Sequence, residues 1–101
     1  MSAITTHVLN TATGRPAANI PVSLERFYEG VWTLRARLET DEDGRARLLE
    51  GAPAGKYRIT FAFGPDAFYP EIAIQFMLRD ARHHHIPLLL SPFGYTTYRG
   101  S

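Results

Sequence analysis

The chain has 101 residues, a formal net charge of +1 and no cysteine. This length suits one domain, residues 1–101, and the interspersed charges form no basic patch for nucleic acid or for an anionic membrane. Without cysteine, disulfides and thiolate metal sites are excluded. No apolar run approaches the roughly 20 residues of a membrane span, and no signal peptide is recognised, so we expect a cytoplasmic protein.

Short segments of alternating polar and apolar residues follow one another along the chain. They are expected to form strands at 4–10, 21–27, 31–38, 45–49, 56–63, 72–78, 86–90 and 95–99. Turn-forming residues separate them, and no strong helical period is present. About eight short strands with this spacing predict an antiparallel sandwich or barrel.

Alternation also predicts which side chains share a face of each strand. The predicted apolar faces are Ile4, Thr6 and Val8; Trp32, Leu34 and Ala36; and Tyr57, Ile59, Phe61 and Phe63. His7 lies on the opposite face of the first strand. Such a histidine is most often a surface residue, so alternation alone assigns it no function.

Three consecutive histidines, His83, His84 and His85, precede the apolar strand at 86–90. Alternation places His83 and His85 on one face with Cα atoms about 6–7 Å apart, close enough to share a metal. A third ligand and a metalloprotease pattern are missing nearby, so we predict no metal site. The plain alternative is a solvated lead-in to a buried strand.

Arg45 follows the acidic turn at 40–44. Its carboxylates lack the spacing of a calcium-binding loop and are expected to be solvated. An arginine after such a turn is also commonly solvated, although a guanidinium suits a planar, oxygen-rich ligand.

Four segments carry a resemblance that covers nearly the whole chain. They are ITTHVLNTATGRPAANIPVSLER, TDEDGRARL, FYPEIAIQF and the C-terminal HHHIPLLLSPFGYTTYRGS. In this order they resemble the 5-hydroxyisourate hydrolases, the transthyretin-related proteins of purine breakdown. The C-terminal block is highly specific to that family.

The resemblance implies one transthyretin-like domain, an all-β sandwich of two four-stranded antiparallel sheets. The family's usual short helix after residue 63 is expected to be missing or vestigial, because only residues 64–68 stand in its place. The implied activity is a cyclic amide hydrolysis that needs no cofactor. Water opens the N1–C6 bond of 5-hydroxyisourate and gives 2-oxo-4-hydroxy-4-carboxy-5-ureidoimidazoline.

The family motifs also imply site residues. His7 in THVLN is the leading candidate for the general base, because imidazole exchanges a proton near neutral pH. His85, two residues before proline, is its implied partner in orienting water or relaying a proton. Arg45 in DGR is the implied anchor for substrate and for developing charge. His84 stands where the family more usually has tyrosine, and it should face away from His85.

The terminal segment is implied to bind substrate. Tyr98, Arg99 and Ser101 belong to the family's terminal tetrapeptide, which lines the pocket. Thr96 shares the strand face of Tyr98 and is expected in the same channel. Whether the hydroxyl or the carboxylate of Ser101 contacts substrate stays open.

The family assembles as a homotetramer, a dimer of dimers with the sites in a central channel. The substrate partner is a small purine-derived molecule. Two alternatives remain open: a transthyretin-like protein that binds a small ligand without catalysis, and a monomeric adhesion or carrier sandwich.

Overall fold

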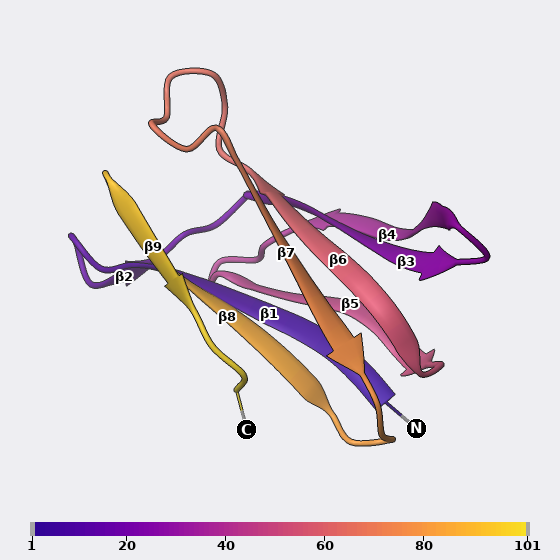
Figure 1. Cartoon of the computed structure of the whole chain (residues 1–101). Coiled ribbons are helices and arrows are strands. Elements are labelled where there is room, and N and C mark those ends of the chain that lie inside the picture. Colours follow the sequence, from indigo (N-terminus) through magenta and orange to yellow (C-terminus); the bar gives the residue numbers. More distant parts are fainter. Residues whose placement is uncertain (1, 101) are drawn as a thin grey trace.

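The computed structural model describes residues 2–100, which form two facing β-sheets (Figure 1). The strands are β1 (Ser2–Asn10), β2 (Arg15–Pro16), β3 (Pro21–Tyr28), β4 (Val31–Glu39), β5 (Arg45–Ala52), β6 (Gly55–Ala62), β7 (Glu71–Leu78), β8 (His84–Ser91) and β9 (Gly94–Thr97). No helix occurs within this range, so the short helix after residue 63 is missing, as predicted. Accordingly, these residues include no helix that could cross a membrane.

The second sheet has the order β4-β3-β6-β7 and is antiparallel throughout. The first has the order β2-β1-β8-β9, and β5 also pairs with β1. It differs in detail from the expected four antiparallel strands, because the two-residue β2 is added and β1 runs parallel to β8. Alternation within a strand identifies its faces but not its partner or their relative direction.

The core lies between the two sheets. Its largest fully buried side chains include Ile4 and Val8 from β1, together with Tyr57, Ile59 and Phe61 from β6. Each such side chain contributes about 1.5–3 kcal/mol on burial. The inner faces therefore supply much of the stability, whereas the outer faces carry both polar and apolar residues.

The predicted shared face of Trp32, Leu34 and Ala36 is wrong. Leu24 and Glu25 are consecutive in β3, yet their partners in β4 are Ala36 and Leu34, which leaves one residue of β4 without a partner. This extra residue is a β-bulge, and it reverses the alternation beyond it. Ala36 therefore packs against the core, whereas Leu34 is 48% exposed.

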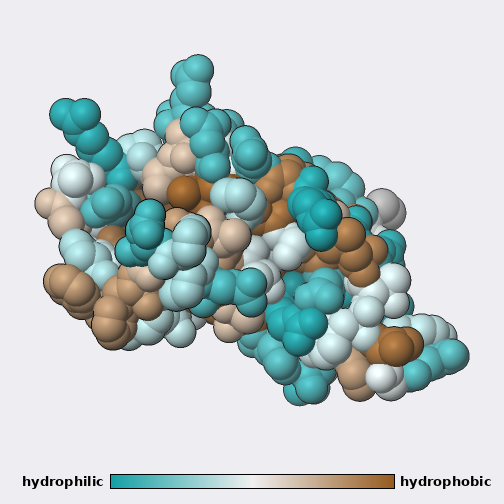
Figure 2. All heavy atoms as spheres, turned by 90° about the horizontal axis from the view of Figure 1, so that it is seen from above, coloured by the Kyte–Doolittle hydropathy of each residue, from teal (hydrophilic) through white to brown (hydrophobic). Residues whose placement is uncertain are grey.

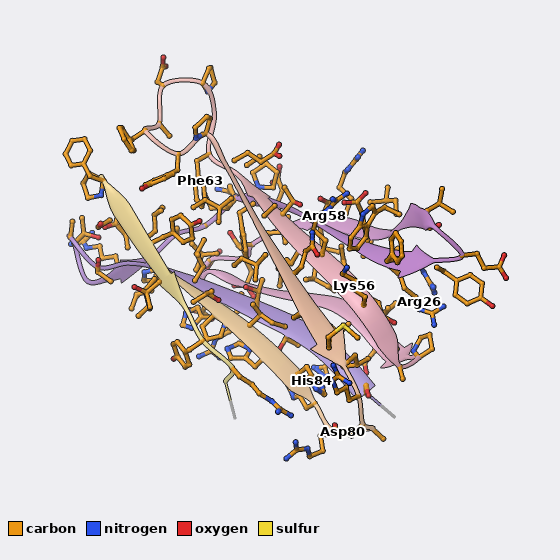
Figure 3. All side chains as sticks on the ribbon, in the orientation of Figure 1. Arg26, Lys56, Arg58, Phe63, Asp80 and His84 are labelled. Carbon is orange, nitrogen blue, oxygen red and sulfur yellow. The ribbon has the colours of Figure 1, made fainter. Side chains whose placement is uncertain are left out.

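Cations cover aromatic rings on the outer face of the second sheet. The Arg58 guanidinium carbon lies 4.2 Å from the ring centroid of Trp32, and Lys56 Nζ lies 5.3 Å from that of Phe27 (Figure 3). In Figure 2, areas of hydrophobic surface are visible between projecting hydrophilic side chains. These contacts occur on the opposite side of the molecule from the histidines of the first sheet.

Candidate active site

The outer face of the first sheet brings together the three residues predicted to be catalytic. His7 of β1 is paired with Arg45 of β5, and Thr5 of β1 is paired with His85 of β8. Neighbouring strands lie about 4.7–4.9 Å apart, and side chains two positions apart share a face. Three adjacent strands therefore present an imidazole, a guanidinium and a second imidazole side by side.

The acidic turn places Arg45 at the start of β5. The Asp41 carboxylate accepts a 2.9 Å hydrogen bond from the Arg45 backbone N–H. Gly44 has φ +75°, and its carbonyl accepts a 2.7 Å hydrogen bond from the N–H of Val8. A Cβ at Gly44 would collide with the Val8 carbonyl oxygen, so glycine is required at this close approach. The turn thus fixes Arg45 beside His7.

A threonine hydroxyl joins two of the three consecutive histidines. Thr5 Oγ1 lies 2.7 Å from His83 Nε2 and 2.8 Å from His85 Nδ1. Thr5 is buried, and His83 is exposed. Sequence reasoning did not select Thr5; the available signal was its position two residues before His7 on the same face.

The environment of His85 favours its neutral form. Burial lowers the pKa of this imidazole below its usual value of 6.5, and the positive charges of His83, His7 and Arg45 lower it further. A neutral imidazole beside a permanent guanidinium charge can orient water or accept a proton. The cluster therefore contains groups that are chemically suited to proton transfer and to charge stabilisation.

The C-terminal segment after β9, residues 98–100, runs alongside His85. The Gly100 N–H donates a 2.8 Å hydrogen bond to the His85 carbonyl, beyond the end of β9. A Cβ at Gly100 would lie 2.8 Å from His85 Cδ2 and 3.0 Å from its Cβ. Glycine thus permits this contact, and the residues before it are held near the site. Ser101 lies outside the described residues.

A hollow of about 170 Å³ lies between β7 and the C-terminal segment. Its lining is Ile74, Phe76, Met77, His84, His85, Ile86, Thr97, Tyr98 and Arg99. Tyr98 and Arg99 thus lie by His85, whereas Thr96 is exposed opposite Leu89 and does not line this hollow. A larger hollow of about 460 Å³ lies towards the far end of β8, where aromatic rings accompany one carboxylate, Asp66.

The consecutive histidines do not converge on one point. His84 faces the interior, with Nδ1 2.7 Å from the Arg82 carbonyl and Nε2 3.8 Å from Asp80 (Figure 3). A hydrogen bond from the Arg82 side chain holds the pKa of Asp80 below its usual value. Among residues 2–100, no group of three or more histidine, aspartate or glutamate side chains is placed to hold a metal ion.

Residues 4–100 match the family model described as the HIUase/Transthyretin family. The chain belongs to the HIUase/transthyretin family. A family relative from Mesorhizobium japonicum, named 5-hydroxyisourate hydrolase, is 44% identical over 97% of this chain and 91% of its own length. The 5-hydroxyisourate hydrolase of Caulobacter vibrioides is 41% identical over the full length of both chains.

Solved structures similar to this chain include a hydrolase and a transthyretin in complex with thyroxine. The Klebsiella pneumoniae 5-hydroxyisourate hydrolase has a TM-score of 0.85 and 36% identity, over the whole of both chains. Sea bream transthyretin in complex with thyroxine has a TM-score of 0.87 and 29% identity, over 96% of this chain and 93% of that one. The fold is therefore common to both activities, and the site has to distinguish them.

Proposed function

We propose that this protein is a 5-hydroxyisourate hydrolase, which uses water to open the N1–C6 amide bond of its substrate. The product is 2-oxo-4-hydroxy-4-carboxy-5-ureidoimidazoline. The observation that carries the proposal is the cluster of His7, Arg45 and His85 on one open sheet face. Amide hydrolysis needs a base for water and a cation for the developing oxyanion, and this cluster contains both. The names of the relatives support the same activity.

His7 is assigned as the general base. It takes a proton from water as the oxygen attacks the C6 carbonyl carbon. When the C6–N1 bond breaks, the same proton passes to N1. His85, neutral because its pKa is lowered, orients the water and relays a proton.

Arg45 is assigned as the anchor for substrate and the stabiliser of the oxyanion. Its guanidinium stays charged and offers several N–H donors in one plane. Loss of one such donor typically costs about 10²–10³ in turnover. No metal or cofactor enters this mechanism.

The terminal residues are assigned to substrate binding. Tyr98, which is 55% exposed, bounds the planar heterocycle, and Arg99 offers hydrogen-bond donors to its oxygens. Thr96, which lies outside the hollow lined by Tyr98, and Ser101 are assigned to substrate binding from the family motif alone. The support is the hydrogen bond from Gly100 to His85, which holds this segment near the cluster.

A homotetramer, arranged as a dimer of dimers, is part of the proposal. Arg45 is exposed, and the cluster lies on a sheet face that no other layer of this chain covers within residues 2–100. A facing subunit would exclude bulk water and strengthen the electrostatics of the site. Light scattering should give four times the chain mass of 11.4 kDa. A cytoplasmic location belongs to the same proposal, and cell fractionation tests it.

The activity is tested with 5-hydroxyisourate generated in place by urate oxidase. The ultraviolet signal of the substrate should decay faster with catalytic amounts of this protein than without it. Nuclear magnetic resonance should identify the ring-opened product. Stoichiometric binding of substrate or thyroxine without accelerated decay would instead favour a ligand-binding protein.

A further inference from the structure

The hydroxyl of Thr5 connects a half-buried histidine to an exposed one. It lies within hydrogen-bond distance of His85 Nδ1 and of His83 Nε2, at 2.8 and 2.7 Å. The two rings are nearly perpendicular, with centroids 6.2 Å apart. Within residues 2–100, Thr5 Oγ1 makes no other hydrogen bond, so its single hydrogen lies toward one of these two nitrogens.

Counting hydrogens leaves two arrangements. In the first, His83 Nε2–H donates to Thr5 and Thr5 donates to His85 Nδ1, so neutral His85 carries its hydrogen on Nε2. In the second, His85 Nδ1–H donates to Thr5 and Thr5 donates to His83 Nε2, so His85 Nε2 has an open lone pair. Protonated His83 can only donate, and it therefore imposes the first arrangement.

We propose that Thr5 and His83 are positioning residues that determine which ring nitrogen of His85 carries its proton. They relay positive charge from His85 to the exposed surface. This inference rests on the proposed hydrolase activity only for its effect on turnover. The coupling between the two imidazoles is a property of the resting protein.

The relay can remove the proton that the newly formed carboxylic acid loses, and each N–H or O–H bond that forms replaces one that breaks. The acid O–H bond breaks and an N–H bond forms at His85 Nε2. His85 Nδ1–H then passes to the Thr5 oxygen, and the Thr5 hydrogen passes to His83 Nε2. His85 ends neutral and His83 ends as imidazolium. In the reverse shift, His83 Nε2–H passes to the Thr5 oxygen and the Thr5 hydrogen passes to His85 Nδ1. Water then takes the hydrogen on His85 Nε2 as the product leaves, and this restores the starting arrangement.

The surroundings explain why the charge should move outward. His7 and Arg45 face His85 from β1 and β5, and its half-buried position disfavours an imidazolium there. His83 opens onto a hollow of about 540 Å³ that also contains Arg82, Arg99 and Gly100. Asp80 Oδ2 lies 3.0 Å from Arg82 Nη2 and 3.9 Å from Arg99 Nη2. His83 is exposed, so water can stabilise a positive charge there.

The direct test is nitrogen-15 magnetic resonance of the histidine side chains without substrate. In the wild-type protein, the hydrogen of neutral His85 should move from Nδ1 to Nε2 as His83 becomes protonated. Thr5→Val removes the hydroxyl and should abolish this dependence, whereas Thr5→Ser should restore it. A His85 tautomer that is identical in Thr5→Val and in wild type at every pH would overturn the proposal.

Kinetics provide a second test. Thr5→Val and His83→Gln should each lower kcat about tenfold with little change in KM, a modest part of what proton transfer supplies. Thr6→Val is the matched control, because Thr6 donates to the Ile86 carbonyl from the core face and touches neither histidine. A normal kcat in Thr5→Val would contradict the relay even if the protein is a hydrolase. An inactive wild-type protein would contradict the proposed function but leave the tautomer measurement decisive.

Discussion

Arg45 and Arg47 lie on the same face of β5 and are both exposed, but only Arg45 is paired with His7. Arg47 instead forms an ion pair with Glu50. Arg45→Ala should lower kcat/KM about 100-fold or more, since it removes the donors for the oxyanion. Arg47→Ala is the matched control and should stay within about twofold, because exposed ion pairs contribute little. Equal losses in the two variants would show that general surface charge, not Arg45, supports turnover.

The environment of His85 predicts how activity should depend on pH. Burial and then the charges of His83, His7 and Arg45 lower its pKa, so its neutral form should persist below pH 6.5. Activity that needs neutral His85 should therefore also persist below pH 6.5 and fall only as this imidazole protonates. A magnetic resonance titration should give a midpoint below 6.5, and Arg45→Ala should raise it. A midpoint at or above 6.5 in the wild-type protein would contradict this environment.

Family motifs predicted His7, Arg45 and His85 at positions that the fold brings together. Thr5 could not be found in this way, because a threonine on the polar face of a strand is ordinary. Its significance depends on the parallel register of β1 and β8, which sets it opposite His85. That register is a long-range property, and a single strand pattern does not contain it.

Among the elements, the turn before β5 fixes the position of Arg45. Gly44→Ala should destabilise the fold by about 2–5 kcal/mol. An alanine in the left-handed backbone conformation costs ~1–2 kcal/mol, and the collision of its Cβ with the Val8 carbonyl adds ~1–3 kcal/mol of overpacking. Gly14→Ala is the matched control: Gly14 also has a positive φ, +72°, but nothing lies within 4 Å of its would-be Cβ. Urea unfolding should separate the two. Equal destabilisation would indicate that the contact with Val8 is unimportant.

Gly100, in the segment after β9, lies close to His85, and a substitution there tests whether this contact positions the site. Gly100→Ala should lower turnover at least about tenfold with little loss of stability, since a Cβ would displace the terminal segment from His85. Gly94→Ala is the control, because its nearest contact would be Ser91 Oγ at an ordinary 3.5 Å. Thermal unfolding and turnover should be measured on the same samples. Full activity in Gly100→Ala would show that this close approach does not position the site.

The strand pattern predicted the buried faces of β1 and β6 well, because period-two alternation is clear there. It failed in β4, where one extra residue reverses the faces of Leu34 and Ala36. A β-bulge leaves no distinct sign in the alternation of a half-buried edge strand. The strands predicted at 86–90 and 95–99 are present as β8 and β9, which pair with each other, although β9 ends at Thr97.

At the scale of the whole molecule, an all-β sandwich was predictable from strand spacing and family motifs. The chain's similarity to both a hydrolase and transthyretin means that this architecture does not by itself decide function. Figure 3 shows Asp80 and His84 together near the β7–β8 connection. The proposed chemistry therefore depends on how the terminal segment and a facing subunit complete one open sheet face.

The most direct measurement is the decay rate of freshly generated 5-hydroxyisourate with the purified protein and with its His7→Ala variant. The wild-type protein should accelerate decay well beyond the spontaneous rate. His7→Ala should lose at least about 100-fold of this turnover, the scale of general base catalysis, while its circular dichroism and assembly stay unchanged. Equal turnover in the two proteins, or no acceleration by the wild type, would contradict the account.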